Sequence, residues 1–287
     1  GIRNVMRLER VYGKKAYELI KENPYRMCDE VDGIGFKTAD KLALSMGLEM
    51  DDPRRLKAAC TALVMDQCMR SGDSYVDIEG LEIAFKKQFP ESDFEYTLQQ
   101  CLVERKLVED EGHIFPLSQY IEERTIARIL TQFPYVSLES MDPLKIHDHL
   151  NRFELAMNIH YDTKQTEAIL SFFEKSFLIL TGGPGTGKTT VVGAMIHLFK
   201  DLYPSYTLAC IAPTGRAAKR LSEINDVQAY TIHSLLKWDL ESNTFGKTEQ
   251  DPLEVDVLII DEFSMVDTYL FAQLLKASQK VAKILIV

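Results

Sequence analysis

A glycine-rich stretch supplies the clearest chemistry in this sequence. It consists of Gly182, Gly183, Pro184, Gly185, Thr186, Gly187, Lys188, Thr189 and Thr190. The spacing fills the G-x-x-x-x-G-K-[ST] pattern of a phosphate-binding loop, between an apolar run and an amphipathic helix. Its glycines let backbone N–H groups face a polyphosphate at a helix N-terminus. Lys188 would reach the β- and γ-phosphates, and the Thr189 hydroxyl would ligate Mg²⁺. An ordinary glycine turn needs neither side chain, so the pattern predicts a site for ATP and Mg²⁺.

Two adjacent carboxylates, Asp261 and Glu262, form a second chemical group. They directly follow the apolar run Val257–Ile260, which is typical of a buried strand. Asp261 would help to hold Mg²⁺ from its second coordination sphere, and Glu262 would orient or deprotonate the attacking water. An acidic helix cap would explain one carboxylate but not two. We therefore predict Lys188, Asp261 and Glu262 as catalytic residues.

Strands and helices alternate around these groups from about residue 160 onward. Strands are predicted at Phe177–Leu180, Thr207–Ala212, Val255–Ile260 and Lys283–Val287, and helices from Thr189, Gly215 and Met265. Apolar strands separated by helices imply a parallel, doubly wound sheet with the ligand at the carboxyl ends of its strands. This half of the chain is therefore predicted to have an α/β fold.

A short repeat near the N-terminus suggests a second binding function. Residues 1–8 and 33–43 match at an offset of 32 residues. The second copy contains Gly33, Ile34 and Gly35 after a short helical run, and it resembles the helix-hairpin-helix module that grips a DNA backbone through N–H groups. Lys37 and Thr38 would add phosphate contacts. The first copy is weaker, because it has no second glycine. The alternative is an ordinary corner between two helices with a glycine cap.

The middle of the chain has mainly helical periodicity. Helices are predicted over residues 54–70, 78–89, 94–105 and 118–132, with a β-hairpin over 107–116 that turns at Glu111 and Gly112. Three helices and a hairpin suggest a winged-helix-like fold. Acidic residues near 91–95 favour a structural spacer over a DNA-binding surface. We place the end of this block near residue 150.

Composition indicates a soluble globular protein of two or three domains. The 287 residues contain no apolar run near the roughly 20 residues that would span a bilayer. The five cysteines form no C-x-x-C pair, which argues against a zinc site and a disulfide framework. Buried thiols in a reducing compartment are expected, and hence a cytoplasmic location with no membrane partner.

The net charge of −10 is concentrated away from the two ends. Residues 51–150 carry eleven Lys and Arg against nineteen Asp and Glu, whereas residues 1–50 carry nine against eight. Overall acidity therefore does not exclude a local DNA-binding surface. The chain starts with Gly1 and stops on an apolar run, so we expect it to be part of a longer polypeptide.

Five sequence blocks together resemble the first half of a RecD-like superfamily 1 DNA helicase. They are Tyr161-Asp162-x-x-Gln165, the phosphate-binding loop, Ala212-Pro213-Thr214-Gly215-Arg216-Ala217-Ala218-Lys219-Arg220-Leu221, Thr231-Ile232-His233, and Asp261-Glu262-Phe263-Ser264-Met265-Val266-Asp267. The repeat and acidic linker resemble the N-terminal region of the longer, stand-alone members. The resemblance implies a helix-hairpin-helix domain over residues 1–50, a linker domain over 51–150 and a RecA-like motor domain over 151–287.

The resemblance also implies roles for particular residues. Gln165 would read the adenine. The path of single-stranded DNA would be lined by Pro213, Thr214, Gly215, Arg216, Thr231 and His233. The loop over 213–216 suits this role, because it offers a hydroxyl, N–H groups and a guanidinium without reading bases. For Arg216 and Lys219 the alternative is a solvated helix face, and His233 alone is weak evidence.

An insertion between Leu236 and Leu253 has no helical period and contains the chain's only tryptophan, Trp238. A small hairpin is expected over about residues 237–253. In RecD-like helicases a hairpin at this place acts as a pin that splits the duplex. The alternative is a disordered surface loop, and the residues do not decide between them.

The resemblance implies an ATP-dependent DNA helicase that moves 5′ to 3′ on single-stranded and forked DNA. Another P-loop DNA-dependent ATPase, or a DNA-binding adaptor with a structural ATP site, remains open. In such helicases a second motor domain supplies an arginine to the nucleotide, and its motifs are not found before Val287. This chain alone is therefore expected to hydrolyse ATP poorly.

Overall fold

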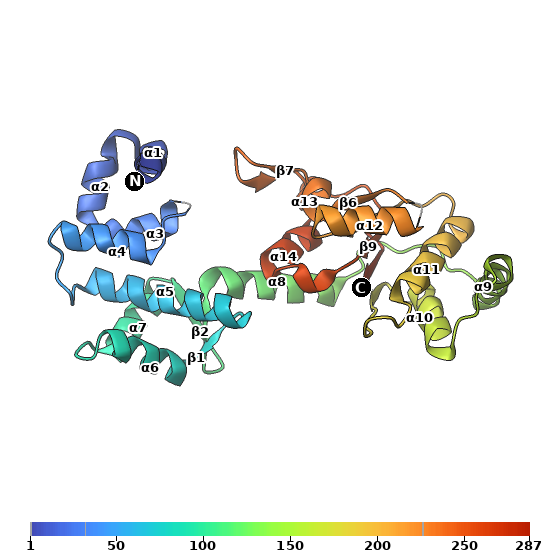
Figure 1. Ribbon diagram of the computed structural model, residues 1–287, viewed down its shortest axis with the longest axis horizontal. Coiled ribbons are helices and arrows are strands. Elements are labelled where there is room, and N and C mark those ends of the chain that lie inside the picture. Colours follow the sequence, from blue (N-terminus) through green and yellow to red (C-terminus); the bar gives the residue numbers. More distant parts are fainter. Residues whose placement is uncertain (1, 32, 226) are drawn as a thin grey trace. The chain divides into compact units, whose positions relative to one another are not determined.

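A computed structural model describes residues 2–31, 33–225 and 227–287; the side chains of residues 2–4 and 225 are not described. The chain forms two compact units, Gly1–Ile121 and Glu122–Val287 (Figure 1). The boundary falls within helix α8, Leu117–Gln132. No helix among the described residues is both long and apolar enough to cross a membrane.

The first unit begins with short helices around a small core. They are α1 (Ile2–Tyr12), a 3₁₀ turn (Gly13–Lys15), α2 (Ala16–Glu22), a second 3₁₀ turn (Pro24–Arg26), α3 (Met27–Glu30) and α4 (Phe36–Ser45). The Asn23 side chain accepts the Tyr25 N–H at 3.0 Å and so caps the second 3₁₀ turn. Tyr25, Met27, Ile34 and Ala39 are buried together.

A buried polar network joins this core to the next helix, α5 (Pro53–Ser71). Asp40 accepts hydrogen bonds from Tyr25 at 2.7 Å and from Arg55 at 2.8 and 3.0 Å. Burial alone would raise the pKa of Asp40, but the hydrogen bonds from Arg55 and Tyr25 hold it below its usual value. The ion pair is satisfied on both sides, which a buried charge requires.

The rest of the first unit contains the helices α5, α6 and α7 and a three-stranded antiparallel sheet. After α5 come β1 (Val76–Asp77), α6 (Ile78–Gln88), α7 (Phe94–Val103), β2 (Leu107–Asp110) and β3 (His113–Pro116), with strand order β1-β3-β2. The predicted hairpin is confirmed, and Glu111 and Gly112 turn it with positive φ values of 50° and 81°. This content suits a winged-helix-like fold, which stays a prediction.

The second unit is built on a five-stranded parallel sheet of order β4-β10-β9-β5-β6. The strands are β4 (Phe177–Ile179), β5 (Leu208–Ala212), β6 (Ala229–Thr231), β9 (Val257–Ile260) and β10 (Lys283–Ile286). The helices between them are α11 (Lys188–Leu202), α12 (Gly215–Asn225), α13 (Ile232–Leu235) and α14 (Thr268–Lys276). The predicted α/β fold with a parallel, doubly wound sheet is confirmed.

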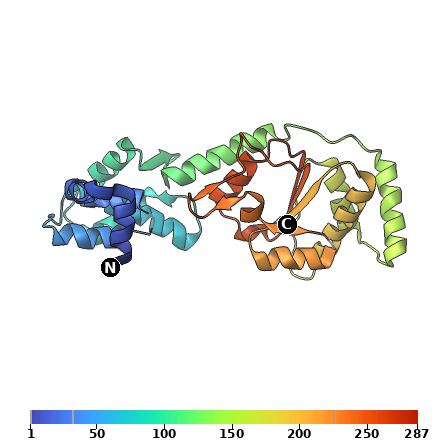
Figure 2. The same cartoon turned by 90° about the horizontal axis from the view of Figure 1, so that it is seen from above.

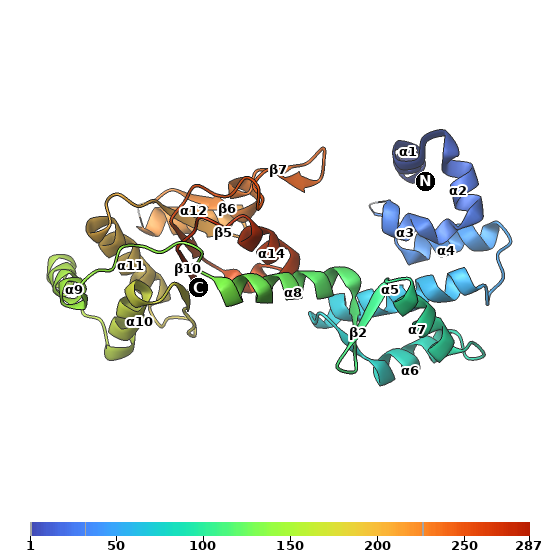
Figure 3. The same cartoon turned by 180° about the vertical axis from the view of Figure 1, so that it is seen from behind.

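Helices cover both faces of this sheet (Figure 2). On one face, Ile259 packs with residues of α9 (Pro143–Met157), α10 (Thr163–Glu174) and α11. On the other face, Leu258 packs with α14, α13 and Ile129 of α8. Lys276 of α14 pairs with Glu122 of α8 at 3.2 Å, where the two helices lie side by side (Figure 3). Successive strand residues thus face opposite layers, which is why the central strands β5 and β9 are apolar throughout.

Two of the differences from the sequence-based expectations lie in the second unit. A helix was predicted from Met265, but Phe263–Met265 forms a 3₁₀ turn and α14 begins at Thr268. The Asp267 side chain accepts the Leu270 N–H at 2.7 Å, which fixes the later start. Strand β6 was not predicted, because three residues are too short to show a period.

The predicted division at residues 50 and 150 stays a prediction, whereas the two compact units meet at residue 121. Helix α9 spans the expected boundary near 150. Its Ile146 and Leu150 are buried against the core that contains Phe172 and Phe199. The segment 122–150 therefore packs as part of the second unit.

Candidate functional site

The glycine-rich loop connects β4 to α11 and has the backbone that its sequence predicts. Gly185 and Gly187 have φ values of 76° and 80°, a region that disfavours side chains. Gly187 also caps α11, and its carbonyl accepts the Val191 N–H at 3.0 Å. A Cβ at Gly182 would lie 2.7 Å from Thr186 Oγ1, so the loop also needs glycine for space. These glycines place the helix N-terminus at the loop's inner edge.

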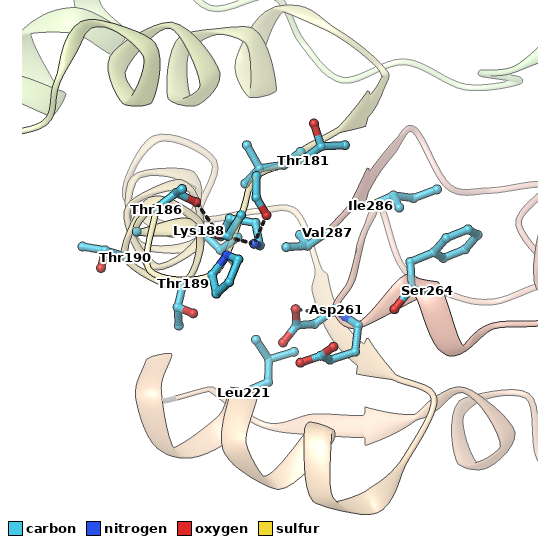
Figure 4. A pocket seen from close by; sticks show the side chains of 18 of the residues that line it. Thr181, Thr186, Lys188, Thr189, Thr190, Leu221, Asp261, Ser264, Ile286 and Val287 are labelled. Carbon is cyan, nitrogen blue, oxygen red and sulfur yellow. Dashed lines mark hydrogen bonds between the residues drawn. The ribbon is translucent and has the colours of Figure 1, made fainter.

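Lys188 folds over the loop. Its Nζ donates to the carbonyl oxygens of Gly182 and Gly183, the second at 3.1 Å, and Thr186 Oγ1 donates to the Gly183 carbonyl at 2.9 Å. Figure 4 shows the ammonium group held between loop residues, with Asp261 across the pocket. A bound phosphate would have to compete with these carbonyls for Nζ.

A pocket of about 950 Å³ opens over this loop. Its walls are the loop and the first turn of α11, the residues after β9, the end of β10, and α12. The members from α12 are Arg220, Leu221 and Ile224. The volume suits a ligand of nucleotide size. The predicted loop residues, Thr189, Asp261 and Glu262 thus line one pocket.

The two carboxylates lie at the carboxyl end of β9. The Asp261 N–H donates to the Ile211 carbonyl at 2.9 Å, and the Glu262 N–H donates to Asp261 Oδ1 at 3.0 Å. Burial raises the pKa of Asp261, and the charge of Glu262 adds to this effect. The hydrogen bond from the Glu262 N–H and the charges of Arg220 and Lys188 oppose it but leave the pKa above its usual value. Asp261 is half-buried and Glu262 is exposed. One carboxylate is therefore held by the sheet, and the other is open to solvent.

Gln165 touches the loop from the start of α10. It forms a capping box with Asp162: Gln165 N donates to Asp162 Oδ1 at 2.9 Å, and Asp162 N donates to Gln165 Oε1 at 3.1 Å. Gln165 Nε2 donates to the Thr186 carbonyl at 3.2 Å. The cap thus fixes the side chain beside the loop. Its predicted contact with adenine stays a prediction.

The residues predicted to line a DNA path come together at neighbouring strand ends. Ala212 of β5 pairs with Thr231 of β6, so the loop 213–216 and Thr231 share one edge of the sheet. Thr214 Oγ1 accepts the Ala217 N–H at 3.2 Å, and Thr231 Oγ1 accepts the Ser234 N–H at 3.1 Å. Both hydroxyls therefore cap helices in this structure. Their contact with DNA stays a prediction.

His233 belongs to an aromatic cluster under the predicted insertion. Residues 238–239 and 244–245 form strands β7 (Trp238–Asp239) and β8 (Thr244–Phe245), which pair antiparallel. Trp238 and Phe245 lie 4.6 Å apart between ring centroids, and His233 lies 5.8 Å from Phe245. Leu240, near the turn, is 86% exposed. The expected hairpin is present, and its role as a pin stays a prediction.

The N-terminal glycines occupy a turn between α3 and α4. Gly33 has a φ of 75°, and a Cβ there would lie 2.3 Å from Arg7 Nη1. Gly35 caps α4, and the exposed Lys37 and Thr38 lie in that helix's first turn. Gly1, the first glycine of the weaker copy, lies outside the described residues; the residues that follow it form α1. Their DNA contacts stay predictions.

Arg220, Leu221 and Ile224 were not predicted to lie at the nucleotide pocket. The amphipathic pattern of residues 215–225 predicts a helix, but it does not tell which face lies over the glycine-rich loop. A spacing of four residues between Arg220 and Ile224 was the available signal, since residues at this spacing share a helix face.

A parallel sheet with a phosphate-binding loop after one strand and two carboxylates after another defines a RecA-like P-loop domain. Comparison with known proteins then narrows the class. A family model described as an AAA domain matches residues 165–287. The model of the ATP-dependent RecD2 DNA helicase HHH domain matches residues 1–75.

Curated relatives agree with these matches. The chain is 28% identical to the ATP-dependent RecD2 DNA helicase of Deinococcus radiodurans over an alignment of 308 residues. This alignment covers 100% of this chain and 41% of that protein. It is 33% identical over 135 residues to the RecBCD enzyme subunit RecD of Haemophilus influenzae, covering 39% of this chain and 21% of that one. The chain thus spans less than half of either relative. The resemblance to RecD-like helicases is confirmed.

Proposed function

We propose that this chain is the nucleotide-binding motor half of an ATP-dependent DNA helicase. The enzyme would couple ATP hydrolysis to movement along single-stranded DNA and to unwinding of forked DNA, and the resemblance suggests 5′ to 3′ polarity. The main support is that a complete phosphate-binding loop and a carboxylate pair line one pocket, in a chain whose N-terminal region matches a RecD2 helicase domain.

The residues of the pocket suit ATP with Mg²⁺. The Thr189 hydroxyl and the Asp261 carboxylate are oxygen donors, the kind that Mg²⁺ prefers, and both line the pocket. When bound, Mg²⁺ would neutralise phosphate charge. Lys188 would exchange its carbonyl partners for the β- and γ-phosphates. The exposed Glu262 would orient the attacking water and take its proton.

The DNA would be held by two separate surfaces. At the sheet edge, the loop 213–216, Thr231 and His233 would follow the backbone of a single strand. The hairpin β7–β8 beside them would meet the fork, with the exposed Leu240 near its turn. The turn at Gly33 and Gly35, with Lys37, would grip duplex phosphates without reading sequence.

The nucleotide assignment is tested by Lys188→Ala. Lys188 donates to two loop carbonyls, and its loss should abolish binding of Mg-ATP while the fold is kept. In a thermal-shift assay, Mg-ATP should therefore raise the melting temperature of the natural chain and leave that of the variant unchanged, because a ligand stabilises only the state that binds it. Equal stabilisation of both proteins would contradict the assignment.

The motor assignment is tested by hydrolysis with and without single-stranded DNA. A motor should hydrolyse ATP faster when oligothymidylate is present, and Glu262→Gln should remove this activity while ATP still binds. General-base removal typically costs about 10²- to 10⁴-fold in rate. Because this chain alone is expected to hydrolyse ATP poorly, the comparison is made on a longer polypeptide that includes a second motor domain. ATP binding there without any hydrolysis that depends on Glu262 would instead indicate a structural nucleotide site.

A further inference from the structure

Helix α12 carries two arginines one turn apart. Arg216 and Arg220 are four residues apart, and side chains at this spacing lie on one helix face. Arg216 lies at the start of the helix, in the loop predicted to meet single-stranded DNA. Arg220 lines the nucleotide pocket together with its neighbour Leu221, whose helix lies across the pocket from Thr189 (Figure 4). The pocket thus has a basic residue in each of two walls.

Arg220 has its donors free for a ligand. It is exposed, and no carboxylate among the described residues forms an ion pair with it. The neighbouring Lys219, in contrast, pairs with Glu223 at 3.7 Å. A guanidinium offers five N–H donors in a planar fork, which suits a pair of phosphate oxygens.

The charges around the pocket accommodate a second basic side chain in addition to Mg²⁺. Asp261 and Glu262 both line it, so a polyphosphate bound there would meet two carboxylates. Lys188 approaches from the glycine-rich loop. Arg220 of α12 lines the same pocket. A terminal phosphate between these walls would therefore be offered a cation from each side.

We propose that Arg220 binds the terminal phosphate of a nucleoside triphosphate from the α12 side, and so distinguishes a triphosphate from a diphosphate. This inference rests on the proposed nucleotide-binding function. Lys188 carries a compact charge that would contact the β- and γ-phosphates. Arg220 would contact only the terminal phosphate, which lies toward the carboxylates. A diphosphate lacks that group, so Arg220 contributes little to its affinity.

The test compares two nucleotides by calorimetry on the 287-residue chain in Mg²⁺. The first is the β,γ-imido analogue of ATP, which is not hydrolysed, and the second is ADP. Arg220→Gln should weaken binding of the analogue about 10- to 100-fold, the usual effect of losing a charge-assisted hydrogen bond, and leave ADP binding nearly unchanged. Lys219→Gln is the matched control, because it removes a charge one residue away, and it should change neither affinity.

The possible outcomes separate this inference from the function on which it rests. Loss of affinity for both nucleotides to the same degree, or for neither, would overturn the role of Arg220 while leaving the nucleotide site intact. If the natural chain bound neither nucleotide, the proposed function itself would fail. Arg220→Lys keeps the charge and the aliphatic stem, so it should retain part of the preference and provides the comparison if Arg220→Gln melts early.

Discussion

Glu262 donates its backbone N–H to Asp261 Oδ1 at 3.0 Å from a left-handed conformation with φ 54° and ψ 42°. The bond closes a tight turn directly after β9. The next N–H, of Phe263, donates to the Val287 carbonyl at 3.0 Å, so the turn is also held by the end of β10. This backbone is costly for a residue with a side chain, and it separates a half-buried carboxylate from an exposed one.

The strain at Glu262 can be measured by comparing two substitutions that both remove its carboxylate. The free energy of unfolding of Glu262→Gly should be about 1 kcal/mol higher than that of Glu262→Ala, because glycine adopts positive φ without steric cost. Chemical denaturation of the two variants gives the difference. If the alanine variant were as stable as the glycine variant, the left-handed turn would not be a source of strain.

The turn at Gly35 allows a clean test of DNA binding. Gly35 has a φ of −89°, and a Cβ there would have no heavy atom within 4 Å. Gly35→Val should therefore fold normally but obstruct a phosphate at the turn, with a loss of about tenfold in duplex affinity. Because the contact is to the DNA backbone, the affinity for duplexes of unrelated sequence should fall by the same factor, and this should hold at each of two salt concentrations.

Gly80→Val is the control for this variant. Gly80 is also open, with no heavy atom within 4 Å of a Cβ, and it lies in α6 of the same unit. It should leave DNA affinity unchanged. A loss at Gly35 confined to one duplex sequence, or none at all, would count against a backbone-gripping turn.

Much of the fold was predictable because burial leaves a simple pattern. The strands at 208–212 and 257–260 are apolar throughout, and the strand at 283–286 is apolar after Lys283, since helices cover both faces of the sheet. The glycine-rich loop was predictable because positive φ at Gly185 and Gly187 and the space at Gly182 admit few other residues.

What could not be predicted depends on contacts between distant segments. Helix α14 starts at the Asp267 cap, because the chain before it is occupied by the left-handed turn at Glu262 and by the bond from the Phe263 N–H to the Val287 carbonyl, which local propensity does not contain. Arg220 lies in the pocket because the face of α12 that carries it is turned toward the glycine-rich loop, and the sequence pattern does not specify that face. The two-residue strand β1 exists only because Val76 pairs with Ile114. The roles of the candidate site residues stay predictions.

Gln165 contacts the loop backbone, and this contact makes its adenine role testable. Gln165→Ala should weaken ATP binding more than GTP binding if the side chain reads the base. Loss of its bond to the Thr186 carbonyl alone would weaken both equally. Affinities for the two nucleotides, measured with the exposed Lys164→Ala as a control, distinguish these cases. An equal loss for ATP and GTP would assign Gln165 to loop positioning instead.

Lys283 should make the stability of the chain depend on pH in the alkaline range. It is 5% exposed at the start of β10, where Nζ donates to the Lys175 carbonyl and lies 5.3 Å from the Phe172 ring centroid. Burial lowers the pKa of Lys283 from its ordinary value of 10.5 to about 8. Between these two values the unfolded chain binds more protons than the folded chain, so stability rises with pH. The full cost of burying the charge applies below about pH 8.

Lys283→Met isolates this effect, because methionine keeps much of the length of the chain and cannot titrate. The difference between the pKa values in the unfolded and folded states corresponds to about 3 kcal/mol. Most of it, about 2 kcal/mol, should appear between about pH 7.5 and pH 10 as a rise in the natural chain's free energy of unfolding relative to the variant. Urea denaturation of the natural chain and of the variant at the two pH values gives their free energies of unfolding. The contributions of other titrating groups cancel in the difference between the two proteins. A difference in stability that stayed constant with pH would show that Lys283 keeps an ordinary pKa in the folded protein.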